Sequence, residues 1–136
     1  MEGQAFRVFH LDTARGPRFC VHHAPAAGRP RRGALLYAHP FAEEMNKSRR
    51  MAAVSARAFA AQGFEVLQVD LLGCGDSPGD FVDATWADWV DDLRAGWHWL
   101  QARTGAPPWL WALRAGCLVA LDAARAEGAA GGAAPP

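Results

Sequence analysis

The sequence has 136 residues, of which 51% are hydrophobic and 21% are charged, a length and composition that suit one compact domain and exclude a disordered chain. Basic and acidic side chains number 14 each, which argues against a nucleic-acid partner. The cluster Arg29, Arg31 and Arg32 sits between prolines and glycines and is interpreted as a solvated loop.

The sequence gives no indication of a cofactor, a metal site or a membrane span. Cys20, Cys74 and Cys117 are widely spaced, without a paired CxxC, so neither a disulfide framework nor a zinc site is predicted. No basic segment followed by an apolar core opens the chain, and no apolar run approaches the roughly 18 residues of a membrane span. We expect a cytoplasmic protein with no cofactor, no metal and no membrane span.

The first third of the chain predicts strands. Phe6 to Leu11 and Arg18 to His23 alternate in polarity around Arg15-Gly16-Pro17, which is typical of an antiparallel hairpin. A polar loop from Pro25 to Arg32 follows. The continuous apolar run Gly33 to His39 then predicts an interior strand of a parallel sheet.

A strand-helix-strand unit follows. Residues 45 to 62 carry apolar side chains at helical spacing, and Gly63 is placed to end that helix. Phe64 to Val69 predicts a second interior strand, joined to the first by a right-handed crossover if the two are parallel. The glycine-rich run from Leu71 to Gly79 is expected to be a loop at the strand's carboxyl end.

A second helix is expected to begin at Thr85, with Asp88 completing a capping box, and to end at Gly105. The residues predicted for its apolar face are Trp86, Trp89, Val90, Leu93, Trp97 and Leu100. Those predicted for its polar face are Asp88, Asp91, Asp92 and Arg94.

The remaining segments complete an α/β fold. Pro108 to Leu113 predicts a third interior strand, in which Trp109 and Trp111 both pack against flanking helices, and Ala115 to Glu127 a third helix. Residues 1–127 form the predicted domain, and residues 128–136 a disordered Ala/Gly/Pro tail. The order β-β-β-α-β-α-β-α indicates a three-layer sandwich with a mostly parallel sheet and an N-terminal antiparallel hairpin.

Functional side chains of such a sheet gather at the carboxyl ends of its parallel strands. His39, Asp70 and the residues around Arg114 should therefore lie at one edge. The segment Ala112-Leu113-Arg114-Ala115-Gly116 lies between a strand and a helix, as does the nucleophile elbow G-x-S-x-G, but with arginine in place of serine.

Three motifs stand in the order expected of α/β hydrolases: His39-Pro40, the stretch from Asp70 to Ser77, and the elbow. The charged loop His39 to Arg50 is similar to the exosortase A system-associated hydrolase 2 family, and the resemblance runs from about Arg18 to Arg125. It implies an α/β-hydrolase fold, an ester- or amide-cleaving ancestry and a link to exopolysaccharide production. By this resemblance the chain is the N-terminal portion of the fold, truncated after the elbow helix.

Catalysis is open. A guanidinium stays protonated and has no free lone pair with which to attack. Ser48, Ser55 and Ser77 all lie away from the elbow, and no triad can be completed, which makes a pseudoenzyme the interpretation. Cys117, inside an apolar helical run, is expected to be a buried, inert thiol rather than a displaced nucleophile.

The candidate site residues each have two interpretations. His39, in the oxyanion loop, either braces its turn or acts as a base, and Asp70 and Asp76 either organise their loop or act as acids. The charged segment either starts a helix or forms a pocket with Arg114. Besides Asp70 and Arg50, the residues proposed for this pocket are Glu43, Glu44, Asn46, Lys47 and Arg49.

Arg114 itself is expected either to form a salt bridge to Glu43, Glu44 or Asp70, or to bind an anion at a helix N-terminus. The functional hypotheses are accordingly a hydrolase-family protein, a noncatalytic anion- or carboxylate-binding module, or a structural subunit that binds a partner. The ligand would be a small molecule or an acyl- or glycan-linked group. An exposed edge at the third interior strand predicts self-association.

Overall fold

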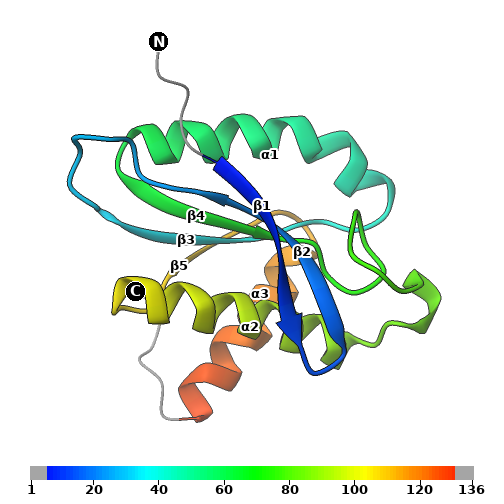
Figure 1. Ribbon diagram of the computed structural model, residues 1–136. Coiled ribbons are helices and arrows are strands. Elements are labelled where there is room, and N and C mark those ends of the chain that lie inside the picture. Colours follow the sequence, from blue (N-terminus) through cyan, green and yellow to red (C-terminus); the bar gives the residue numbers. More distant parts are fainter. Residues whose placement is uncertain (1–5, 131–136) are drawn as a thin grey trace.

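The computed structural model describes residues 6–130, which form a five-stranded sheet flanked by helices (Figure 1). The strands are β1 (Phe6–Thr13), β2 (Gly16–His23), β3 (Gly33–Ala38), β4 (Phe64–Val69) and β5 (Trp109–Ala112). The helices are α1 (Glu43–Ala61), α2 (Trp86–Thr104) and α3 (Gly116–Ala129), with a short 3-10 turn, η1 (Phe81–Asp83).

The strand order is β1-β2-β4-β3-β5. β3 is parallel to both β4 and β5, whereas β2 is antiparallel to β1 and β4. Helix α1 covers one face of the sheet, and α2 and α3 cover the other (Figure 1). The structure therefore confirms the three-layer α/β sandwich with its N-terminal antiparallel hairpin.

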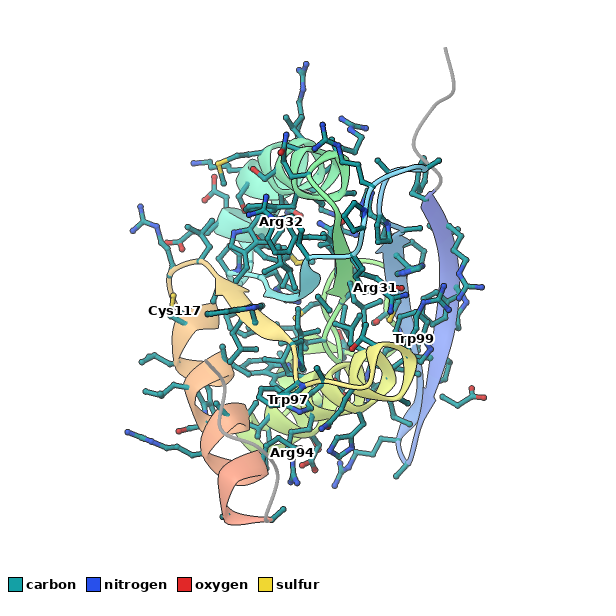
Figure 2. All side chains as sticks on the ribbon, turned by 90° about the vertical axis from the view of Figure 1, so that its left-hand side faces the viewer. Arg31, Arg32, Arg94, Trp97, Trp99 and Cys117 are labelled. Atoms are coloured by element: carbon teal, nitrogen blue, oxygen red, sulfur yellow. The ribbon has the colours of Figure 1, made fainter. Side chains whose placement is uncertain are left out.

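The main core lies between the sheet and helices α2 and α3. Leu36, Leu67, Leu93 and Trp97 are completely or almost completely buried there, and Figure 2 shows Trp97 on α2. Burial of each such side chain stabilises the fold by about 1.5–3 kcal/mol. The second cluster, under α1, is built around Leu35, Ala56 and Val66.

The expected helix ends need small adjustments. The capping box is confirmed: Asp88 N donates to Thr85 Oγ1 at 3.1 Å, and Thr85 N donates to Asp88 Oδ2 at 2.9 Å. Helix α1 begins at Glu43, two residues early, and α3 continues to Ala129, two residues beyond Glu127. Residues 131–136 of the predicted tail lie outside the described residues.

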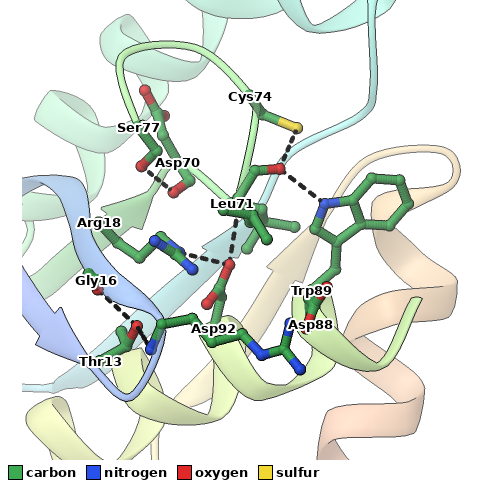
Figure 3. Close-up of polar contacts among 12 residues, drawn as sticks. Thr13, Gly16, Arg18, Asp70, Leu71, Cys74, Ser77, Asp88, Trp89 and Asp92 are labelled. Atoms are coloured by element: carbon green, nitrogen blue, oxygen red, sulfur yellow. Dashed lines mark hydrogen bonds and ion pairs between the residues drawn. The ribbon is translucent and has the colours of Figure 1, made fainter. Parts of the chain in front are cut away.

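The predicted polar face of α2 is partly wrong, because Asp88 and Asp92 are buried. Arg18 of the hairpin is also buried, with its Nε 2.8 Å from Asp92 Oδ2, and Leu72 N donates to the same oxygen at 2.8 Å (Figure 3). The hairpin and the loop after β4 thus cover this side of α2. The periodicity of α2 cannot predict this burial, because the hairpin and the loop after β4 come from other parts of the sequence.

The two tryptophans of β5 differ in their packing. Trp111 packs against Tyr37 and Phe59, with ring centroids 4.2 and 5.3 Å away. Trp109 is 46% exposed, so the expectation that both pack against helices is wrong for this residue. Within residues 6–130, β5 pairs with β3 alone, which leaves the predicted edge open.

Candidate functional site

The carboxyl ends of β3, β4 and β5 meet at one edge of the sheet. Leu71 N, just after β4, donates to His39 Nε2 at 3.1 Å, and Leu113 N, just after β5, donates to the Ala38 carbonyl at 3.3 Å. The N-termini of α1 and α3 lie at the same edge, since both helices follow these strands directly. The structure therefore brings the predicted motifs together.

The turn from β5 into α3 has a strained backbone at Arg114, whose φ is +53°. Ala42, which precedes α1, has a φ of +55°, and these are the only two non-glycine residues with positive φ in residues 6–130. Such conformations cost roughly 1–3 kcal/mol and tend to cluster at functional sites. Both lie at the carboxyl edge of the sheet.

Gly116 allows α3 to start directly against β3. A Cβ atom at this position would lie 2.4 Å from the Ala38 carbonyl oxygen and 2.6 Å from the His39 carbonyl oxygen. Only glycine fits so close to backbone. This contact fixes the turn that carries Arg114 beside the loop that follows β3.

The Arg114 side chain is 70% exposed, and its Nε lies 3.6 Å from Glu44 Oε2, itself 54% exposed. Of the three predicted acidic partners, Glu44 is the one in contact. Glu43 pairs with Lys47 at 3.2 Å, and Asp70 pairs with Arg49. A long, exposed pair of this kind contributes about 0–1 kcal/mol, so the guanidinium is held only weakly.

His39 is buried, and both of its ring nitrogens are engaged. Nδ1 lies 2.7 Å from the Pro40 carbonyl, and Nε2 accepts the hydrogen bond from Leu71 N. This pattern requires the neutral ring with its proton on Nδ1. Burial favours the same neutral form, because it lowers the pKa of His39. The geometry favours bracing over general-base chemistry.

Buried histidines also make stability depend on pH. Burial lowers the pKa values of His22, His23 and His39 below the usual 6.5. The unfolded chain therefore takes up protons before the folded protein, and stability is lost as the pH falls through about 6.5. Urea titrations should give a lower free energy of unfolding at about pH 5.5 than at about pH 7.

His39→Gln should reduce this pH dependence, by up to about 1.4 kcal/mol per pH unit for one fully coupled histidine. His10→Gln, at an exposed position of the hairpin, is the matched control and should leave the dependence unchanged. Equal stability of the unmodified protein at both pH values would contradict the prediction.

Asp70 organises the loop that follows β4. Arg49 donates to its two carboxylate oxygens at 2.6 and 2.8 Å, and Asp76 N donates to Oδ2 at 2.9 Å. Ser77 Oγ donates to the Asp70 carbonyl at 2.5 Å, a bond drawn in Figure 3, and accepts from Phe19 N at 2.8 Å. Both side chains are buried and serve the loop rather than the turn at Arg114.

The other serines and the charged segment belong mainly to α1. Ser48 Oγ donates to the Glu44 carbonyl within the helix at 2.7 Å, and Ser55 is half-buried on the same helix. Asn46, Lys47 and Arg50 are exposed. The segment is therefore a helix start, and of the proposed pocket residues it brings Glu44 to Arg114.

Cys117 is exposed, so the prediction of a buried thiol is wrong. Figure 2 shows it on the first turn of α3. Leu118 and Leu121 are also exposed, because no layer of the described residues covers this side of the helix. Cys20 and Cys74 are buried, which raises the pKa of each thiol to about 12.

An aromatic cluster beside the site was not predicted. The Phe41 ring lies 5.4 Å from His39 and 4.4 Å from Trp89, and Phe81 lies 5.4 Å from Trp89. Phe41 follows His39-Pro40, and Phe81 follows the glycine-rich loop, so the sequence signal was an aromatic residue just after each motif. The cluster lies beside His39, at the loop that follows β3.

Residues 29–133 match the family model described as serine aminopeptidase S33. The chain belongs to this family of α/β hydrolases. The match covers more than half of the sequence, and it includes β3, β4 and β5 together with all three helices. No curated protein matches the sequence.

Solved structures of α/β hydrolases are similar in fold. A serine hydrolase without a lid from Xanthomonas campestris is 25% identical, with a TM-score of 0.73 over 93% of this chain and 58% of its own. An esterase from the archaeon Pyrobaculum calidifontis is 17% identical, with a TM-score of 0.73 over 96% and 42% of the two chains. Est1E from Butyrivibrio proteoclasticus, solved with ferulic acid, is 20% identical, with a TM-score of 0.69 over 89% and 48%.

The chain thus spans about half the length of these structures. Within residues 6–130, no three histidine, cysteine or acidic side chains are grouped so as to hold a metal ion. No helix in the same range is long and apolar enough to cross a membrane.

Proposed function

We propose that this α/β-hydrolase family member binds an anionic ligand, a carboxylate above all, at the turn that carries Arg114, and does not perform serine hydrolysis. The observation behind the proposal is the strained strand-to-helix turn, with Arg114 at its tip and Gly116 packed against β3. This is the local geometry in which α/β hydrolases hold their nucleophile.

Serine chemistry lacks both a nucleophile and a base at the turn that carries Arg114. Ser48 and Ser77 are engaged by backbone groups, and neither lies at the turn. Both nitrogens of His39 are occupied. The guanidinium of Arg114 stays protonated and cannot replace a serine hydroxyl as a nucleophile.

Anion binding follows from the charges at this edge. Neither α1 nor α3 has a side-chain cap, but the first amides of α3 already donate to backbone carbonyls, Gly116 N to Leu113 at 3.0 Å and Cys117 N to Arg114 at 2.9 Å. The N-terminus of α1 is therefore the one that offers amide groups to a ligand beside Arg114. Arg114 is exposed and held only by its long contact with Glu44. A carboxylate could displace Glu44 and take a bidentate hydrogen bond from the guanidinium.

Calorimetry with hexanoate tests the proposal. Arg114→Ala should weaken binding by about tenfold or more, because a charge-assisted hydrogen bond contributes about 1.5–3 kcal/mol. Arg125→Ala is the matched control: Arg125 is 71% exposed and pairs with Asp122 at 3.5 Å on the same helix. Equal affinity of hexanoate for the unmodified protein and both variants would refute a site at Arg114.

A fluorophosphonate probe tests the catalytic part. We expect no labelling of the unmodified chain and no turnover of short p-nitrophenyl esters. Labelling that disappears when Ser48, Ser55 or Ser77 is replaced by alanine would restore the hydrolase interpretation.

We further propose that the protein is cytoplasmic and has a role in exopolysaccharide or exosortase-linked processes. The support is the resemblance carried by the charged loop His39 to Arg50. The ligand would then be an acyl- or glycan-linked carboxylate, and the aromatic cluster of Phe41 and Phe81 beside His39 would supply apolar contacts for its body.

Self-association through β5 is a separate proposal. Its support is the open strand edge with the exposed Trp109. Light scattering at tens of micromolar protein should show oligomers, and a monodisperse monomer would contradict it.

A further inference from the structure

A cavity of about 220 Å³ lies on the face of the sheet that α1 covers. Its lining includes Phe6, Val21, His23, Arg49, Arg57 and Gln68. In the antiparallel register of β2 with β4, Val21 lies opposite Gln68, and His23 lies opposite Val66. From Arg49 the cavity therefore runs back along β2, away from the edge that carries Arg114.

The hairpin and α1 form the two walls. Val21 and His23 are two residues apart on β2 and so point to the same face, as does Phe6, which is opposite His23 on β1. Helix α1 packs mainly over β4 and leaves the hairpin partly uncovered, with Phe6 and Val8 exposed. The result is a groove with an apolar strand wall and a helical wall that carries arginines.

His23 supplies an unused hydrogen-bond acceptor. The residue is 3% exposed, and its Nε2 lies 3.2 Å from Gln68 Oε1. Burial lowers the pKa of His23, so the ring is neutral near pH 7, with its proton on the nitrogen that faces the glutamine oxygen. Nδ1 is then an acceptor without a partner among the described residues, and it is itself buried from solvent. A ligand reaches it only when a neighbouring side chain moves aside, such as the exposed Phe6, whose ring centroid lies 5.8 Å from that of His23.

The groove also has an uncompensated positive charge. Arg49 is neutralised by its bidentate contact with Asp70. Arg57 is exposed and has no carboxylate within ion-pair distance in residues 6–130. With His23 neutral, the lining has a net charge of about +1, which favours an anion.

We propose that this groove binds a small hydroxycarboxylate with an aryl or alkyl body. The carboxylate would contact Arg57, and the apolar body would lie against Phe6 and Val21. The hydroxyl would donate to the buried His23 Nδ1 after the Phe6 ring moves aside. At about 30 Å³ per water molecule, the volume corresponds to roughly seven waters, which suits a ligand of this size.

Three related probes separate the contributions of the carboxylate and the hydroxyl to binding. Mandelate carries all three groups, phenylacetate lacks the hydroxyl, and benzyl alcohol lacks the carboxylate. In two-dimensional NMR, mandelate should shift the Val21 backbone amide and the Gln68 side-chain amide. Phenylacetate should bind several-fold more weakly, and benzyl alcohol at least tenfold more weakly, than mandelate.

Variants locate the site. Arg57→Ala should weaken mandelate binding at least tenfold, whereas Arg50→Ala, which removes another exposed arginine of the same helix, should leave it unchanged. Mandelate is also a carboxylate and can bind at Arg114, so binding in the groove is followed at Val21 and Gln68. The affinity measured from these two signals should be unchanged in Arg114→Ala, which separates this proposal from the one at the β5–α3 turn. Equal weakening by Arg50→Ala, shifts confined to that turn, or no shifts at millimolar mandelate would each overturn the proposal.

Discussion

Gly116→Ala should lower the free energy of unfolding by about 3 kcal/mol, measured by urea denaturation. The added Cβ would lie 2.4 Å from the Ala38 carbonyl oxygen and 2.6 Å from that of His39. Both contacts are with backbone, which cannot move aside as a flexible side chain could. Relief therefore requires α3 to shift away from β3.

Gly128→Ala is the matched control for this substitution. Gly128 lies on the same helix, and a Cβ there would meet no atom within 4 Å. Alanine should stabilise the protein by about 0.5–1 kcal/mol, because glycine is the poorer helix former. Similar effects of the two substitutions would show that the close contact between α3 and β3 is unimportant.

Arg18→Met should destabilise the protein by about 3–5 kcal/mol near pH 7, because it leaves the carboxylate of Asp92 buried without its cation. Burial already raises the pKa of Asp92, even with Arg18 Nε at 2.8 Å. Without the guanidinium this pKa should rise further. The loss should then be larger at high pH than at low pH, since protonation removes the unpaired charge.

Two comparisons isolate the buried pair. Arg15→Met removes the partner of Asp88, but Arg15 is 67% exposed, so the expected loss is below about 1 kcal/mol. In the double variant Arg18→Met/Asp92→Asn the amide oxygen can still accept from Leu72 N, and much of the lost stability should return. A double variant no more stable than Arg18→Met would refute the explanation by unpaired charge.

Local signals in the sequence predicted the elements well. Thr85 and Asp88 define the start of α2 through a capping box whose two hydrogen bonds depend only on neighbouring residues. The apolar runs of β3 and β4 indicated strands buried on both faces, and the parallel pairing of β3 and β4 followed from the helix between them. These features are fixed within short stretches of chain.

The buried charged residues could not be predicted from such local signals. Asp92 has the spacing of a solvent-facing residue on α2, and only the folded hairpin brings Arg18 to it from 74 positions away. Glu65 is similar: it lies buried within the apolar run of β4, where His22 and Arg103 both contact Oε1. A pattern within one element carries no information about partners on another.

At the candidate site the sequence located the turn but not its contacts. The motif order placed Arg114 beside the loop after β3, and the positive φ and the packing of Gly116 agree with a nucleophile-elbow geometry. The choice of Glu44 over Glu43 and Asp70 depends on the rotation of α1 and on Arg49 occupying Asp70. The exposure of Cys117 depends on which layers surround α3.

The attachment of β5 has a thermodynamic consequence. This strand has four residues and, within residues 6–130, is paired along one side only, yet it leads directly into the turn that carries Arg114. A molecule that paired with the open side would restrict the motion of the turn. Occupancy of the strand edge and affinity at Arg114 would then be linked, each changing the other by the same factor.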